Sequence, residues 1–230
     1  MPIPRYLAMT PGEFQSVSPL PSKVGWMACR FSADGPGISD LPRQLPPGSL
    51  LILNDSRPMA DHDPEKICAQ LKAAGEKLRI SGLLLDFERA ENPGQKDLAR
   101  LLTEALPCPV AVSEAYAREL SGPVFLSPVP PEEPLERRLE PWRHRPVWLE
   151  LAGTRRSLRV TEAGTEASDS PDAGPLPLAD SRLRCHYRID KAGDQITFTL
   201  GRTPEDQQQL LSDGEVLGVT CGVGLWQEFR

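Results

Sequence analysis

The feature that most constrains the fold of this chain is a series of short apolar segments, each bounded by proline, glycine or aspartate. Several of them, such as Leu50–Leu53 and Leu83–Leu85, are apolar on both faces. That pattern is typical of parallel strands with helices on one side and a core on the other. The chain has 25 prolines in 230 residues, about twice the average usage, and they lie at the ends of these segments rather than inside them. The eight segments that we expect to form strands are Arg5–Thr10, Val24–Phe31, Ser49–Asn54, Gly82–Phe87, Pro109–Ser113, Pro123–Ser127, Pro146–Leu151 and Val216–Val223.

Between these segments lie stretches with the period of an amphipathic helix. In Pro64–Leu78 and Gln95–Leu106, apolar residues recur at helical spacing with charged residues between them. The shorter stretches Ser113–Leu120, Pro134–Leu139 and Pro204–Ser212 are further helix candidates.

The alternation of strand and helix with short connections predicts a parallel α/β sheet. Eight strands favour a closed (β/α)8 TIM-type barrel over an open sheet, and 230 residues are enough for one such barrel. Neither a G-x-G-x-x-G motif nor a P-loop follows the first strand, so no nucleotide-binding motif supports the open alternative. We therefore predict an α/β fold in which residues 1–230 form a single barrel domain.

Two regions interrupt the alternation. Pro11–Ser22 is rich in proline and serine and does not look helical, so we expect the barrel to be irregular at its start. We expect residues 152–203 to form an insertion between strands seven and eight. Within it, the composition of Glu162–Ala179 indicates a flexible loop, and the alternating segments Leu183–Asp190 and Gln195–Leu200 predict a β-hairpin.

Composition argues against several classes of function. The five cysteines include no C-x-x-C pair and the three histidines have no metal-ligand spacing, so we expect reduced thiols and neither a metal nor another cofactor. A net charge of −6 argues against a nucleic-acid partner. No apolar run reaches the roughly 18 residues that a membrane span needs, and no signal peptide is visible. We therefore expect a cytoplasmic protein that binds a carbohydrate or another small molecule.

The fourth predicted strand ends in two carboxylates. Because residues i and i+2 of a strand point to the same face, Leu84, Asp86 and Glu88 share one face. Two carboxylates about 6–7 Å apart along a strand repel each other, and burial adds a desolvation cost, so the pKa of one of them should rise. A carboxyl group that stays protonated near neutral pH is what a general acid requires. Alternatively, both are solvated residues at a strand end, with Glu88 paired to Arg57 or Arg89.

Other polar groups follow neighbouring strands at the end where barrels of this type place their sites. The candidates for substrate binding are Asn54, Asp55, Arg57, Glu114, Tyr116, Glu150 and Trp226. The first three also fit an ordinary turn, and Trp226 also fits a plug at the end of the barrel. Glu150 has the same phase along its strand as Trp148, so its side chain points either into the site or toward the helices.

The segment Ser81–Glu88 resembles the signature of the chitinase-like glycoside hydrolases of family 18. The fourth barrel strand of that family reads D-G-x-D-x-D-x-E, and Gly82, Asp86, Phe87 and Glu88 match it in place. The resemblance implies that Glu88 is the general acid that protonates the glycosidic oxygen. It also implies that Asp86 orients the N-acetyl group of the substrate, which acts as the internal nucleophile. The expected insertion after strand seven and the position of Trp226 near the end of strand eight agree with the family pattern.

Two residues depart from that signature, because Ser81 and Leu84 stand where the family has aspartates. Three hypotheses therefore follow. The first is a retaining glycosidase that cleaves N-acetylhexosamine-containing oligosaccharides. The second is a barrel without catalytic activity that binds a glycan or a protein partner. The third is a hydrolase or lyase of another barrel family, with Arg57 or Arg89 as an anion clamp.

Overall fold

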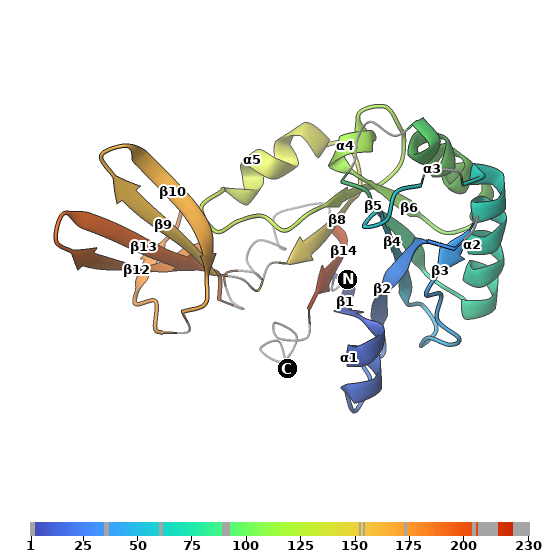
Figure 1. Cartoon of the computed structure of the whole chain (residues 1–230), viewed down its shortest axis with the longest axis horizontal. Coiled ribbons are helices and arrows are strands. Elements are labelled where there is room, and N and C mark those ends of the chain that lie inside the picture. The colour runs from blue at the N-terminus through green and yellow to red at the C-terminus, as the bar shows by residue number, and fades with distance from the viewer. Residues whose placement is uncertain are drawn as a thin grey trace.

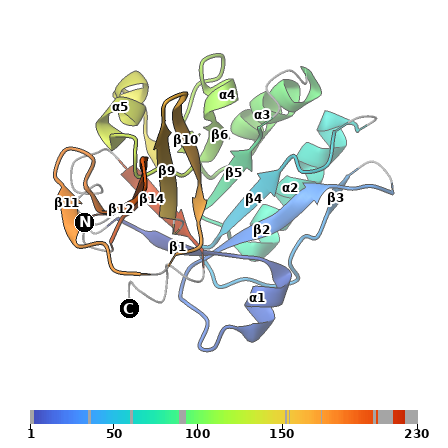
Figure 2. The ribbon, with the colours of Figure 1, turned by 60° about the vertical axis from the view of Figure 1, so that its left-hand side comes forward.

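The computed structural model describes residues 3–34, 37–59, 62–88, 93–151, 153, 155–172, 174–203, 206 and 216–222. Eight parallel strands close into a barrel in the order β1-β14-β8-β7-β6-β5-β4-β2, and β2 pairs back onto β1 (Figures 1 and 2). This arrangement confirms the predicted (β/α)8 architecture. The barrel strands are β1 (Arg5–Met9), β2 (Val24–Phe31), β4 (Leu50–Asn54), β5 (Gly82–Asp86), β6 (Val110–Ser113), β7 (Val124–Leu126), β8 (Val147–Leu151) and β14 (Val216–Cys221). A short strand, β3 (Ile38–Ser39), pairs antiparallel with β2 outside the ring.

Helices cover the outside of the barrel, as Figure 2 shows for the arc from α2 to α5. The two long ones, α2 (Pro64–Leu78) and α3 (Pro93–Ala105), confirm the predicted helices, and α4 (Glu114–Ala117) and α5 (Leu135–Leu139) are shorter. The α2 helix begins after Asp63, whose carboxylate accepts the backbone N–H groups of Glu65 and Lys66. A 3-10 turn, η1 (Glu140–Trp142), follows α5 directly. Of the predicted helix Pro204–Ser212, only Asp206 is among the described residues.

Among the described residues, no helix combines the length and the apolar character that crossing a bilayer requires.

The barrel separates two apolar cores. The outer core lies between strands and helices and includes Leu53 and Leu85 of the sheet with Leu71 and Leu102 of α2 and α3. The inner core fills the barrel itself, and its residues come from alternate positions of six strands. The members of the inner core are Tyr6, Leu50, Ile52, Leu84, Ala111, Phe125 and Trp148.

Trp148 is the largest residue of the inner core, and glycines make the space for it. A Cβ added at Gly218 of the neighbouring strand β14 would overlap the indole ring, with Cε3 of Trp148 only 2.8 Å away. Across the barrel, a Cβ at Gly82 would lie 3.8 Å from the same ring. The Tyr6 ring packs against Trp148 with 5.4 Å between centroids. The position of Trp148 therefore depends on a glycine at residue 218.

The region between β1 and β2 corrects one prediction, because Pro11–Ser16 forms the helix α1. Thr10 and Glu13 form a capping box in which each side chain accepts the backbone N–H of the other residue, and Pro11 occupies the first helical turn. The prediction rested on the prolines and serines of this segment, whereas the signal for the helix is the T-x-x-E spacing of Thr10 and Glu13.

A five-stranded antiparallel sheet lies between β8 and β14 in the chain and stands to one side of the barrel in Figure 1. The hairpin predicted within residues 152–203 is confirmed by β12 (Cys185–Ala192) and β13 (Gln195–Gly201). The remaining strands are β9 (Arg155–Thr161), β10 (Gly164–Ser170) and β11 (Leu178–Asp180).

The interpretation of Glu162–Ala179 as a flexible loop is therefore wrong, since β10 and the start of β11 lie within it. Strand β10 is an exposed edge strand of polar residues, which gives it the composition of a loop. Its pairing with β9 places Glu166 opposite Arg159 and Asp169 opposite Arg156. These opposite charges favour a strand that local sequence alone does not indicate.

The Gly218→Ala variant should be less stable than the natural protein by about 1–3 kcal/mol, because the added methyl group overlaps the Trp148 ring and forces the inner core to shift. Chemical denaturation followed by tryptophan fluorescence measures this difference. Gly12→Ala in α1 is the matched control, since nothing lies within 4 Å of a Cβ at that position. Equal stability of the two variants would show that the barrel accommodates the overlap without cost.

Candidate active site

A pocket of about 310 Å³ lies at the carboxyl ends of β4 and β5. Asp86 and Glu88 both line it, which is the face expected from the position of Leu84 in the inner core. Asp86 is half-buried and Glu88 is exposed. The residues that line the pocket are Met27, Ile52, Asn54, Asp55, Ser56, Asp86 and Glu88.

Asn54 lines the pocket while its amide holds the neighbouring strand in place. The Nδ2 group donates to the carbonyl oxygens of Met27 (3.0 Å) and Cys29 (3.1 Å), where the register of β2 against β4 shifts. Its Oδ1 atom accepts the backbone N–H of Ser56 at 3.2 Å. The side chain thus fixes the wall of the pocket that Met27 forms.

Asp55 holds the backbone of Glu88, the candidate catalytic residue. Its side chain is almost fully buried and accepts the backbone N–H of Glu88 at 3.2 Å. It also accepts from Nε2 of Gln95 on α3 at 3.2 Å. Gln95 in turn accepts the hydroxyl proton of Tyr116 at 2.6 Å. This chain of hydrogen bonds ties the end of β5 to two helices.

Tyr116 therefore belongs to the support of the site and not to the lining of the pocket. It is 1% exposed, and its ring packs edge-on against Phe87 with 5.9 Å between centroids. Sequence reasoning missed Gln95, which is fully buried. The signal that could have found it is its place three residues before Leu98 on the apolar face of the predicted helix.

Ser113 also holds the end of β5, and sequence reasoning missed it too. Its hydroxyl donates to the carbonyl oxygen of Phe87 at 2.6 Å, between the two carboxylates of the pair.

Glu150 points into the barrel, which decides between the two orientations left open by the sequence. It lies two residues after Trp148 on β8, and Trp148 belongs to the inner core. Glu150 is half-buried and lies next to the buried residue Thr220 in the pairing of β8 with β14. It does not line the pocket between β4 and β5, but the charge of Asp86, which does line it, acts on Glu150.

Burial and like charges raise the pKa of two carboxyl groups at this end of the barrel. Burial, with the charges of Glu88 and Asp55, raises the pKa of Asp86 to about 6. Burial, with the charge of Asp86, raises the pKa of Glu150 to about 7. Neither side chain has a hydrogen-bond or ion-pair partner within the part of the chain that the structure describes. The arrangement can therefore hold a proton near neutral pH, as the sequence predicts for one member of the pair.

The remaining predicted site residues are not among those that line this pocket. Glu114 forms an ion pair with Arg138 of α5, and both side chains are about one-quarter exposed. Arg57 does not line the pocket; its charge, together with the stronger effect of the hydrogen bond from Arg30, lowers the pKa of Asp40. Trp226 lies outside the described residues. No cluster of three or more metal-ligating side chains occurs among the residues that the structure describes.

The models of known protein families and the sequences of curated proteins contain no match to this chain. Among solved structures, the fold is similar to that of the spore cortex-lytic enzyme SleL of Bacillus megaterium QM B1551. The superposition has a TM-score of 0.56 at 12% sequence identity and covers 95% of this chain and 70% of that chain. At this identity the similarity shows a shared fold.

Glu150→Gln should make the protein more stable than the natural chain at pH 8 by about 1–3 kcal/mol, with little difference at pH 4. The folded state keeps a proton on Glu150 up to about pH 7, whereas an unfolded glutamate releases it near pH 4.3. The unfolded state therefore binds fewer protons between these values, so stability falls as the pH rises through this window and is level above it.

Urea denaturation of both proteins at pH 4, 6 and 8 measures the difference. Glu76→Gln, at an exposed position of α2, controls for the loss of one carboxylate. A Glu150→Gln variant that gains no stability at pH 8 would contradict the burial of this carboxyl group.

Proposed function

We propose that this protein is a glycoside hydrolase that cleaves small N-acetylhexosamine-containing oligosaccharides, with Glu88 as the general acid. The observation that supports the proposal most directly is that Asp86 and Glu88 line one pocket at the carboxyl end of the fourth barrel strand. The similarity of fold to an enzyme described as spore cortex-lytic agrees with it. The pocket volume of about 310 Å³ is at the lower end for ligand sites, which favours a small substrate.

In the proposed reaction, the carbonyl oxygen of the N-acetyl group attacks the anomeric carbon while the glycosidic bond breaks. Glu88 gives its proton to the departing oxygen, and its exposed position at the rim of the pocket suits contact with a leaving group. Water then opens the cyclic intermediate and returns a proton to Glu88. Asp86, held deeper in the pocket, orients the N-acetyl group and stabilises the positive charge that develops on it.

The substitution of leucine for an aspartate at residue 84 bears on this mechanism. Leu84 is fully buried in the inner core, between Ile52 and Ala111 in the pairing of the strands. The strand of Asp86 therefore supplies no carboxyl group at the position two residues before it, where the family signature has an aspartate. Glu150 points into the barrel from β8, and the charge of Asp86 contributes to its raised pKa, so we assign to Glu150 the place of the missing carboxyl group, as a positioning residue beside Asp86.

A barrel that binds a glycan without turnover is the second candidate, and Ser81 is the observation that favours it. In place of a carboxylate, Ser81 donates to the carbonyl oxygen of Gly48 at 2.7 Å and lies 3.1 Å from the hydroxyl of Tyr6. These contacts connect Ser81 to other segments of the barrel and leave it no part in catalysis. A glycan titration with saturable binding and no product would support this candidate over the first.

Glu88→Gln should lower kcat/KM on fluorogenic N-acetylglucosamine oligomers by about 10²–10⁴-fold, because the amide cannot give a proton to the leaving group. Initial rates between pH 4 and 8 measure the loss. Glu114→Gln is a matched control, since Glu114 pairs with Arg138 and does not line the pocket, and this variant should be as active as the natural protein. Equal activity of Glu88→Gln and the natural protein would exclude Glu88 as the acid.

Glu150→Gln should shift the pH–rate profile toward lower pH. Of these two carboxyl groups Glu150, with a pKa of about 7, releases its proton last, and without it the limb of the profile reports Asp86, whose pKa is about 6, so this limb moves to more acidic values. A profile of kcat/KM from pH 4 to 8 for both proteins measures the shift. A loss of rate with the profile unmoved would indicate a structural role for Glu150.

A further inference from the structure

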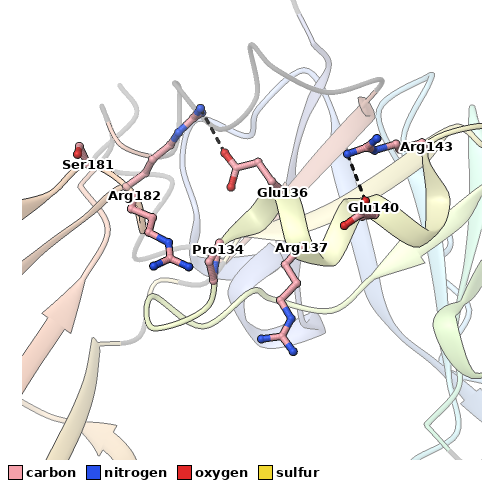
Figure 3. A pocket seen from close by; sticks show the side chains of 8 residues that line it. Pro134, Glu136, Arg137, Glu140, Arg143, Ser181 and Arg182 are labelled. Atoms are coloured by element: carbon pink, nitrogen blue, oxygen red, sulfur yellow. Dashed lines mark ion pairs between the residues drawn. The ribbon is translucent and has the colours of Figure 1, made fainter.

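A second hollow, of about 470 Å³, lies between the helix α5 with η1 and the turn that joins β11 to β12 (Figure 3). It shares no residue with the carboxylate pocket. Both of its walls follow barrel strands that end at the same face, since α5 comes after β7 and the small sheet comes after β8. The residues that line it are Pro134, Glu136, Arg137, Glu140, Arg143, Ser181, Arg182 and Arg184.

The lining carries a positive charge that is opposite to that of the whole chain. Four arginines face two glutamates, so the hollow has a formal charge of +2 in a protein of net charge −6. Glu136 pairs with Arg184 across the hollow at 3.3 Å, and Glu140 pairs with Arg143 along one wall at 3.4 Å. These two ion pairs use both carboxylates of the lining.

Two guanidinium groups are left for a ligand. Among the described residues, the guanidinium groups of Arg137 and Arg182 have no ion-pair partner. They come from opposite walls, and in Figure 3 both side chains extend away from the ion pairs drawn as dashed lines. Each planar guanidinium group can bind a carboxylate or phosphate through two parallel hydrogen bonds.

A half-buried arginine, Arg202, connects the two walls. The guanidinium group of Arg202 donates to the carbonyl oxygens of Val129 (2.6 Å) and Glu133 (2.8 Å), which precede α5. It also donates to Leu183 in the opposite turn at 3.4 Å. Within that turn, Asp180 accepts the backbone N–H groups of Arg182 and Leu183, each at 2.9 Å. The hydrogen bonds of Arg202 and of the turn, together with the ion pair between Glu136 and Arg184, therefore set the distance between the two walls.

We infer that this hollow is a binding site for a ligand with two oxyanion groups, carboxylates or phosphates, which Arg137 and Arg182 hold from opposite walls. A single anionic group would gain little from exposed guanidinium groups, whereas a ligand that reaches both walls gains from both at once. The site does not depend on the proposed glycosidase activity, and it uses none of the residues assigned to it.

The test uses two small compounds that each carry two oxyanion groups, inorganic pyrophosphate and malonate, with uncharged N-acetylglucosamine as the negative control. Isothermal titration at low salt should give saturable binding of at least one of the two with a dissociation constant below about 1 mM. The binding should weaken as ionic strength rises, because the guanidinium groups are exposed. Tighter binding of pyrophosphate indicates a phosphorylated ligand, and tighter binding of malonate indicates a carboxylated one; both results support the inference.

The double variant Arg137→Gln/Arg182→Gln should weaken this binding at least tenfold. The matched control is Arg118→Gln/Arg159→Gln, which removes the same charge from exposed positions outside the hollow and should bind as the natural protein does. Thermal melting of both variants confirms that they are folded. Absence of saturable binding by the natural protein, or an equal loss in both double variants, would overturn the inference.

Discussion

The narrow interior of the barrel limits what each strand can place at the site. The inner core holds Trp148 beside Gly218. A strand cannot shift by one residue in this packing, because the shift would exchange its inward and outward side chains. Because the side chains of a strand alternate between two faces, an apolar residue in this core determines which residue comes next on the same face at the carboxyl end. Ile52 is followed by Asn54, Leu84 by Asp86, and Trp148 by Glu150. The packing inside the barrel thus selects the polar groups at its mouth.

The carboxyl groups at the mouth differ in their surroundings, and their chemistry differs accordingly. Asp86 and Glu150 lie just above apolar residues of the inner core, where loss of water and repulsion by neighbouring carboxylates keep a proton bound near neutral pH. Asp55 is more deeply buried, but it accepts hydrogen bonds from Glu88 and Gln95. Its role is therefore to hold the backbone of Glu88. The site combines a rigid support with two carboxyl groups that the described residues leave without partners.

The junction between the barrel and the small sheet is polar, unlike the interior of the barrel. Arg202 donates to three carbonyl oxygens there, and Arg156 of the small sheet pairs with Glu132 of the segment before α5 at 3.1 Å. Directional hydrogen bonds of this kind set the relative position of the two elements. This is why a charged hollow can persist between them.

The sequence by itself determined the barrel, because strand and helix periods depend on local apolar patterns that each segment carries. All eight strands and the two long helices occur close to their predicted positions, and Asp86 and Glu88 share the predicted face. The helix α1 was not predicted, although Thr10 and Glu13 have the spacing of a capping box. The strand β10 was not predicted either, because its stability depends on charges of β9 opposite it.

Only the tertiary structure decided which polar residues meet. Side chains from distant segments determine that Glu150 points into the barrel. They also place Gln95 and the buried Tyr116 in the chain of hydrogen bonds that holds the end of β5. The same is true of Arg137 and Arg182, which are 45 residues apart in the chain and line one hollow. A local pattern records the period of a segment, but the pKa of a carboxyl group and the partner of an arginine depend on what the fold places beside them.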